Sequence, residues 1–366
     1  MIPFLILFLY LSLVPSFTSS LVNEEKKRKW QAILCGIGVW ALLALRSIDC
    51  GRDLYEFYQG YIGYIPSFHD ISNDSLKNIL SLSWSGTNYE VGYRLYNWLV
   101  GNIISKDPHV FLAITAAIEI FLLGYTFLKK SPDIVLSYFV FACFGLYVFS
   151  FSGLRQALAL SMTFFSYNFF DRQKPWMAVS IILFATTFHT SALLFLPALF
   201  LRNMTMSRKK ALSSLFLIVT VLVPFVMTVL QYGARLLYGH EKYTDDNGGS
   251  FGLLILYILI FVISVGSISS NNNDNKALSR VQWFILCAIL LQSTGIFSAG
   301  AFARVAYYYS VFFTLLLPLS FKKQRNKQLY RTLTILLLIA YFIFTTSTGY
   351  LDVVPYQFWW EDNYKF

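Results

Sequence analysis

The residues best suited to chemistry gather between Arg46 and Tyr96, in the longest extramembrane segment of a largely apolar chain. This segment combines arginines, acids and tyrosines: Arg46, Asp49, Arg52, Asp53, Tyr55, Glu56, Tyr58, Tyr89, Glu90, Tyr93 and Arg94. A guanidinium presents a planar fork of donors that matches a phosphate group and stays charged at any relevant pH. Carboxylates beside such arginines can hold them in place or take part in proton transfer. The segment therefore predicts an anion-binding site with acid–base groups next to it.

Five arginines share a place at or near the outer end of a predicted apolar helix: Arg46, Arg52, Arg155, Arg235 and Arg304. A charge at such a place is costly unless it pairs, faces water or extends to the interface, so it is a functional candidate. For a single arginine, extension to the interface is an equally good explanation. Several arginines converging on one face are what a lipid diphosphate headgroup requires, and we expect these five to bind one.

Arg155 is the strongest member of this set. It lies in S-G-L-R-Q-A-L-A, where Gly153 and the alanines that follow allow close helix packing. The pattern places Arg155 in the first turn of a helix, where the positive end of the helix dipole adds to its charge and favours anions.

Proton transfer has three main candidates, His189, Asp53 and Glu90, with His240 and Glu241 behind them. An imidazole can titrate near neutral pH, so His189 is suited to the role of a general base. A lone histidine in an apolar stretch is more often structural, and Asp53 and Glu90 could equally position the arginines.

The elements that must position these residues are membrane helices. The 366 residues are 56% hydrophobic and only 13% charged, with a mean hydropathy of +0.56, which excludes an ordinary soluble domain. Apolar runs of about 18–20 residues recur along the chain, and each can cross a ~30 Å hydrocarbon core as a helix. The sequence predicts an all-α, polytopic integral membrane bundle that forms a single transmembrane domain over residues 1–366. The first run, Ile2 to Phe17, is interpreted as a retained span rather than a signal peptide.

Clusters of Lys and Arg mark the cytoplasmic loops, which also explains the net charge of +10 without nucleic acid. Placing all of the clusters inside predicts about ten full spans: Ile2 to Phe17, Gln31 to Leu45, Val110 to Leu128, Ile134 to Phe149, Leu154 to Phe170, Leu212 to Leu230, Phe251 to Ser267, Val281 to Phe297, Ala306 to Leu319 and Thr332 to Thr346. Residues 46–109 and 231–250 then form outer loops, and Gly92 to Ser105 forms an interfacial helix that does not cross.

Residues Pro175 to Leu201 have basic flanks on both sides. The chain must therefore enter and return within about 25 residues, and each arm reaches only ~16–20 Å at 1.5 Å per residue. This predicts a re-entrant helical pair with His189 at its tip. The alternative is one ordinary helix, which would place Arg202 to Lys210 outside.

In order and spacing, four motifs resemble the EpsG family of membrane polysaccharide polymerases, which is similar to Wzy-type O-antigen polymerases. They are G-R-D-L-Y-E-F at Gly51 to Phe57, Y-E-V-G-Y at Tyr89 to Tyr93, S-G-L-R-Q-A-L-A at Ser152 to Ala159, and F-H-T-S-A at Phe188 to Ala192. The resemblance implies a GT-C-like fold and transfer of a glycan from undecaprenyl diphosphate to a lipid-linked repeat unit, with inversion. It also implies a functional Arg155-Gln156 pair and supports His189; Tyr55 completes the candidate binding set.

The same resemblance implies a bacterial inner membrane location with the active site on the periplasmic side. Expected partners are undecaprenyl-diphosphate-linked glycans, membrane lipids, a chain-length regulator and a flippase, with no nucleic acid. No metal-ligand pattern, paired-cysteine motif or nucleotide-binding loop occurs in the sequence, so we expect neither a metal nor another cofactor. Two other classes are alternatives: a lipid-linked oligosaccharide flippase or other transporter, and an O-antigen ligase or acyltransferase, which would share much of this layout. A transporter should carry ionisable residues near mid-membrane, whereas here they cluster on one outer face.

Overall fold

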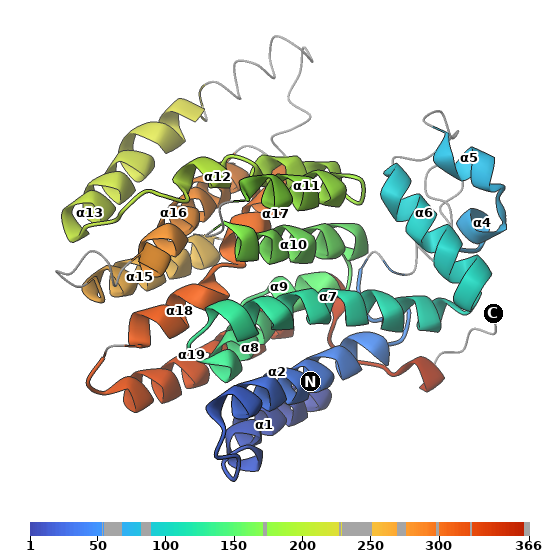
Figure 1. The fold of residues 1–366 in the computed structure, drawn as a ribbon, viewed down its shortest axis with the longest axis horizontal. Coiled ribbons are helices and arrows are strands. Elements are labelled where there is room, and N and C mark those ends of the chain that lie inside the picture. Colours follow the sequence, from blue (N-terminus) through green and yellow to red (C-terminus); the bar gives the residue numbers. More distant parts are fainter. Residues whose placement is uncertain are drawn as a thin grey trace. The chain divides into compact units, whose positions relative to one another are not determined.

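The computed structural model describes residues 1–52, 54, 68–81, 89–170, 174–226, 228, 251–268, 276–297, 300–322 and 324–361. The chain forms two compact units, one made of Met1–Leu193 with Arg331–Phe366 and the other of Leu194–Tyr330. Both consist of helices and turns (Figure 1), and over the described ranges the only strand-like pairing is an isolated antiparallel bridge between Arg46 and Phe358. The predicted all-α fold class is confirmed.

The first unit is built mainly from apolar helices, three of which begin at polar N-cap residues. Its main elements are α1 (Ile2–Phe17), α2 (Glu24–Ala44), α7 (Pro108–Lys130), α8 (Ile134–Cys143), α9 (Leu146–Ser150), α10 (Leu154–Ser166), the 3₁₀ turn Tyr167–Phe169, α11 (Pro175–Thr186) and most of α19 (Lys327–Ser347). The side chains of Asn23, Asp107 and Asp133 each accept a backbone hydrogen bond from the first turn of the following helix. Helix α2 packs against α1, α7 and α8, while α10 packs against α7 and α11.

Three short helices follow the first polar segment: α4 (Phe68–Asn73), α5 (Leu76–Leu80) and α6 (Val91–Leu99), the last continued by a π-helical turn over Val100–Ile104. Helix α6 is amphipathic and buries Tyr93, Arg94 and Asn97. Trp98 Nε1 donates to the Asp74 carbonyl at 3.0 Å, which ties α6 to the residues between α4 and α5. The helix predicted over Gly92 to Ser105 is therefore present, and its position at the membrane surface stays a prediction.

The second unit is organised around α16 (Lys276–Phe297). Its other elements are α12 (Ala198–Leu201), α13 (Arg208–Leu217) with a π-helical continuation over Ile218–Leu222, α15 (Phe251–Gly266), α17 (Gly300–Ser310) and α18 (Phe313–Phe321). Phe284 of α16 packs against Phe312 with ring centroids 4.6 Å apart, and Phe195 stacks on Phe312 at 5.8 Å. These aromatic rings form the core of this unit.

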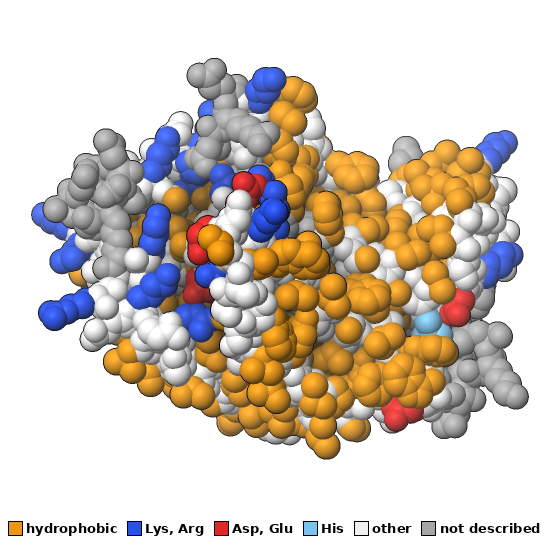
Figure 2. Space-filling model, turned by 60° about the horizontal axis from the view of Figure 1, so that its bottom comes forward, with side chains coloured by type: hydrophobic (Ala, Val, Ile, Leu, Met, Phe, Trp, Pro, Cys, Tyr) orange, Lys and Arg blue, Asp and Glu red, His pale blue; other side chains and the backbone are white. Residues whose placement is uncertain are grey.

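The described residues include four helices long and apolar enough to cross a membrane: Pro108–Lys130, Arg208–Val226, Lys276–Ile296 and Lys327–Ser347. Five shorter apolar helices accompany them: Ile2–Phe17, Ile134–Cys143, Pro175–Thr186, Thr190–Leu201 and Phe251–Gly266. Hydrophobic side chains cover broad parts of the surface (Figure 2), including Leu337 at 71% and Phe121 at 68% exposure. Such exposure suits lipid rather than water, so the chain is a multi-pass membrane protein. The count of ten full spans and the GT-C-like arrangement stay predictions.

Two of the predicted spans are interrupted. The run Ile134 to Phe149 forms α8 and α9, separated at Gly145, whose left-handed φ of 88° ends one helix before the other begins. The run Ala306 to Leu319 falls in α17 and α18; between them Phe312 donates to the carbonyl three residues back rather than four. Each run was predicted as a single helix, and in each case that detail is wrong.

Candidate functional site

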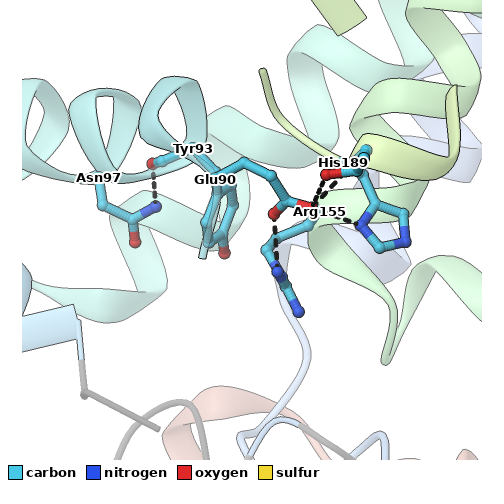
Figure 3. Close-up of polar contacts among 6 residues, drawn as sticks. Glu90, Tyr93, Asn97, Arg155 and His189 are labelled. Atoms are coloured by element: carbon cyan, nitrogen blue, oxygen red, sulfur yellow. Dashed lines mark hydrogen bonds and ion pairs between the residues drawn. The ribbon is translucent and has the colours of Figure 1, made fainter. Parts of the chain in front are cut away.

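Three of the predicted site residues meet within the first unit (Figure 3). Glu90 Oε2 accepts a hydrogen bond from Arg155 Nη1 at 2.8 Å, and Glu90 Oε1 lies 3.1 Å from His189 Nδ1. Thr190 adds two hydrogen bonds to Oε1, from its backbone N–H at 2.9 Å and its hydroxyl at 3.2 Å. The side chains of Glu90, Arg155 and His189 are 15%, 28% and 27% exposed. The result is a partly open polar cluster of Glu90, Arg155, His189 and Thr190, which we call the Glu90 cluster.

Glu90 is positioned by the start of α6, where it is the N-cap residue. Its backbone has the extended conformation usual for an N-cap residue (φ −64°, ψ 146°), but its side chain makes no capping bond and points to other partners. The next turn contacts Thr187, because the backbone N–H of Tyr93 donates to the Thr187 carbonyl at 3.2 Å. Gly92 permits this approach: a Cβ there would overlap the Thr187 side chain and lie 2.7 Å from its carbonyl oxygen. The start of α6 is thereby fixed against the segment that carries His189.

His189 occupies an interruption in the helical path. Helix α11 ends at Thr186, and a 3₁₀ segment begins at Thr190 and runs to Phe195. His189 still donates its backbone N–H to the Ala185 carbonyl at 3.0 Å, which holds it against the last turn of α11. A helical pair with His189 at its tip requires a break in the helix at this residue, and the break is present. The re-entrant path through the membrane stays a prediction.

Arg155 is in the first turn of α10, as its sequence context predicts. The guanidinium carbon lies 4.3 Å from the centroid of the Tyr89 ring, a cation–π contact. The Tyr89-Glu90 pair thus holds one arginine in two ways, by stacking and by charge. Gly153 is the N-cap of α10, and a side chain there would collide with the Phe149 ring. The absence of a side chain therefore allows the tight turn into the helix.

The carboxylate of Glu90 is ionised under ordinary conditions. Burial alone would raise its pKa, but the hydrogen bonds from His189 and the Thr190 backbone, together with the charge of Arg155, lower the pKa to about 2. A carboxylate can only accept hydrogen bonds, so His189 Nδ1 must carry the proton it shares with Glu90. In the neutral imidazole, Nε2 is then the acceptor nitrogen. Figure 3 shows the other ring nitrogen on the side away from Glu90.

This electrostatic arrangement separates the roles of two predicted proton-transfer residues. Glu90 is too weak a base to take a proton from a hydroxyl group, while its fixed charge orients the ring and would stabilise an imidazolium. In His189, by contrast, the ring nitrogen Nε2 can accept a proton. The geometry therefore favours His189 as general base and Glu90 as the positioning residue.

Arg46 lies in the interior of the same unit, with 1% of its surface exposed. Its Nη1 donates to the Leu43 carbonyl at 2.8 Å, and its guanidinium carbon lies 5.0 Å from the centroid of the Phe151 ring. It also interacts electrostatically with Glu119, whose carboxylate accepts a hydrogen bond from the Ser150 hydroxyl. Arg46 therefore contacts the turn that leads into α10, four residues before Arg155, and no contact described for it reaches the Glu90 cluster.

Three other predicted residues have described positions. Arg52 Nε forms an exposed ion pair with Asp352 at 2.9 Å, Gln156 is buried in α10, and Arg304 is exposed on α17 of the second unit. Asp53, Tyr55 and Arg235 lie outside the described residues, as do His240 and Glu241. The structure thus brings together Arg155, His189 and Glu90, and the diphosphate-binding role of the other arginines stays a prediction.

Two polar residues with specific contacts in the first unit are not among the candidates from the sequence. Thr190, directly after the histidine in F-H-T-S-A, supplies two of the bonds to Glu90. Glu119 is a lone acid within an apolar helix, and that alone marks a residue with a specific partner. Within the described ranges, no group of three or more His, Cys, Asp or Glu residues is placed to hold a metal ion.

Comparison with known proteins agrees with the sequence motifs. The family model described as the EpsG family matches residues 29–358, which is most of the chain and includes Glu90, Arg155 and His189. Searches of curated proteins and of solved structures gave no match. EpsG-type proteins are Wzy-like polymerases. With a match of this extent, the chain belongs to the EpsG family.

Proposed function

We propose that this protein polymerises a surface polysaccharide by joining lipid-linked repeat units at the Glu90 cluster. Family membership indicates a membrane polysaccharide polymerase of the Wzy type. The observation that carries the assignment to this site is the convergence of a general base, its carboxylate partner and an arginine from three separate segments. The donor is a glycan on undecaprenyl diphosphate, and the acceptor is a hydroxyl of a newly exported repeat unit on the periplasmic face of the inner membrane.

The reaction follows from these roles. His189 Nε2 takes the proton of the acceptor hydroxyl while that oxygen attacks the anomeric carbon of the donor sugar. The bond from the anomeric carbon to the diphosphate oxygen breaks, and its electron pair leaves with the lipid diphosphate. A single in-line displacement inverts the anomeric configuration. Glu90 stabilises the imidazolium that forms, and Arg155 offsets the charge that develops on the leaving group.

Two features make the arginine suited to this role. Arg155 is fixed by Tyr89 and Glu90 before substrate arrives, so little reorganisation accompanies the reaction. It also lies at the N-terminal turn of α10, where the helix dipole favours a negative group. The mechanism needs no metal, because the positive charge at the leaving group comes from the protein.

Deletion of the gene, followed by gel analysis of surface polysaccharide, tests the function. Collapse of the ladder to core plus one repeat unit is expected, since export and ligation continue without polymerisation. Loss of every repeat unit, including the first, would instead indicate a flippase or a ligase and overturn the proposal. Complementation with wild-type protein should restore the ladder, and Arg155→Ala at an equal protein level should not.

A further inference from the structure

A long apolar groove opens on the surface between α2 and α7, on the first unit. Its volume is about 430 Å³, and Ile33, Ile37 and Phe121 form its exposed walls. It runs along α2 from Lys29 to Trp40, and the rise of 1.5 Å for each residue makes this roughly 16 Å of helix. That length is about half of a ~30 Å hydrocarbon core, which is the depth of one leaflet.

The floor of the groove includes two glycines, which have no side chain to fill it. Gly36 and Gly124 lie opposite the hydroxyl of Tyr138, and a Cβ at Gly36 would approach that oxygen to 3.1 Å. The same hydroxyl donates to the Ala32 carbonyl at 3.2 Å. Both glycines make room for the hydroxyl of one buried tyrosine. The depression therefore results from the close packing of this tyrosine against α2 and α7.

One end of the groove is basic. Lys29, whose ammonium pairs with Glu25 at 2.7 Å, lines it, and the ammonium of Lys129 lies 5.7 Å from the centroid of the Tyr125 ring, which also lines it. Arg28 donates to the carbonyl of Leu128, another lining residue, at 2.9 Å. Residues 23–30 and 128–131 together carry six Lys and Arg against two Glu. This end therefore attracts a negative headgroup, whereas the rest of the groove is suited to hydrocarbon.

We propose that this groove binds one acyl chain of an anionic phospholipid, with the lipid phosphate at the Lys29 end. Three observations select this occupant: an apolar lining, a length that fits one leaflet, and an excess of positive charge at one end only. By the distribution of basic residues, that end faces the cytoplasmic leaflet. The site is independent of the proposed glycosyl transfer and rests on the membrane location alone.

Native mass spectrometry of the full-length protein in detergent tests the proposal. Dioleoyl phosphatidylglycerol is the probe, and phosphatidylcholine with the same chains is the uncharged comparison. Wild-type protein should retain one phosphatidylglycerol in preference to phosphatidylcholine. Replacing Lys29 by Gln should reduce that preference about fivefold, as expected for one basic residue near an anionic lipid.

Filling the groove should displace the chain itself. Ala117→Phe and Ala32→Phe insert a ring from opposite walls, and each should lower retention of both lipids about tenfold, as expected if roughly two methylenes lose their contacts. Ala340→Phe, at an exposed position on α19, is the control for an added ring elsewhere and should bind like the wild type. Two different filling variants guard against misfolding of either one.

Retention of lipid at the wild-type level in both filling variants would overturn the site. The proposal would also fail if the wild-type protein retained the two lipids equally and Lys29→Gln did not change that ratio. A competition experiment identifies the occupant. If undecaprenyl phosphate displaced phosphatidylglycerol at equal concentration, the groove would be assigned to the carrier lipid and the phospholipid would be rejected.

Discussion

Glu90 Oε1 lies 3.1 Å from His189 Nδ1, although 99 residues separate the two in the chain. The contact joins the start of α6 to the end of α11, and it gives the imidazole a fixed orientation and a defined tautomer. Arg155 completes the arrangement on the other carboxylate oxygen. The role proposed for each side chain has a separate experimental consequence.

Removal of the imidazole should abolish most of the activity. His189→Ala is expected to lower kcat by about 10²- to 10⁴-fold, the usual contribution of a general base, with a smaller change in KM. Added imidazole should restore part of the rate in this variant and none in Arg155→Ala, because only the first lacks a proton acceptor. If His189→Ala showed the wild-type rate without added imidazole, His189 would have no role in the chemistry.

Glu90→Gln should preserve the shape of the side chain and remove its charge. We expect kcat to fall with little change in KM for the acceptor, because the amide no longer fixes the tautomer of His189 or stabilises its imidazolium. Glu90→Asp, which keeps the charge, should recover part of kcat. A rise in KM at unchanged kcat would show instead that Glu90 binds substrate.

Stability should depend on the ionisation of Glu90. Its pKa is about 2 in the folded protein against a reference of 4.5, so the carboxylate stabilises the fold fully above pH 4.5 and loses that contribution as the pH falls towards 2. The contribution is up to about 3 kcal/mol. The difference in Tm between wild type and Glu90→Gln should therefore be largest near neutral pH and shrink below about pH 4.5. A difference that stays constant down to pH 3 would contradict the ionised, paired state.

Gly92→Ala should separate α6 from the segment that carries His189. The added methyl group meets Thr187 on both its side chain and its carbonyl oxygen, and overpacking of this kind costs about 1–3 kcal/mol. Activity should fall together with stability, and Thr187→Gly should rescue only the part caused by the side chain. Gly266→Ala is the matched control, because a Cβ there meets nothing within 4 Å. Equal Tm values for the two alanine variants would refute the close approach.

Arg46 offers a test of the interior of the first unit. Arg46→Met should destabilise the protein by about 1–3 kcal/mol, because the buried guanidinium loses its hydrogen bond to the Leu43 carbonyl. Glu119→Gln should cost less in the Arg46→Met background than in the wild type, and a double-mutant cycle would report this electrostatic interaction as coupling. Additive effects of the two substitutions would show that the residues do not interact.

Much of the site could be predicted from the sequence because its residues occur in short motifs. The sequence predicts Arg155 in the first turn of a helix, which is confirmed, and His189 at the tip of a re-entrant helical pair, for which the structure shows the break between the two helical segments. The choice of partners could not be read from the sequence, since Glu90, Arg155 and His189 come from three segments whose packing depends on the whole unit. Spacing alone does not say which of several acids reaches the histidine.

Errors in the fold have local causes. The break between α8 and α9 depends on the left-handed conformation of Gly145, and hydropathy does not detect a single residue of that kind. The sequence predicts Arg46 at an outward-facing helix end, but its side chain is buried, donates to the Leu43 carbonyl and lies over the ring of Phe151, which is 105 residues further along the chain. Contacts with distant residues such as Phe151 depend on the packing of the whole unit, so the sequence around Arg46 does not reveal them.

The most direct test of the central claim is chain extension by the purified protein. Lipid-linked single repeat units extracted from the deletion strain serve as substrate, with wild type, His189→Ala and Arg155→Ala compared at equal concentration in the presence of a chelator. The account predicts glycans of two or more units with the wild type alone. Failure of the wild type to extend the substrate, or extension by His189→Ala at the wild-type rate, would contradict it.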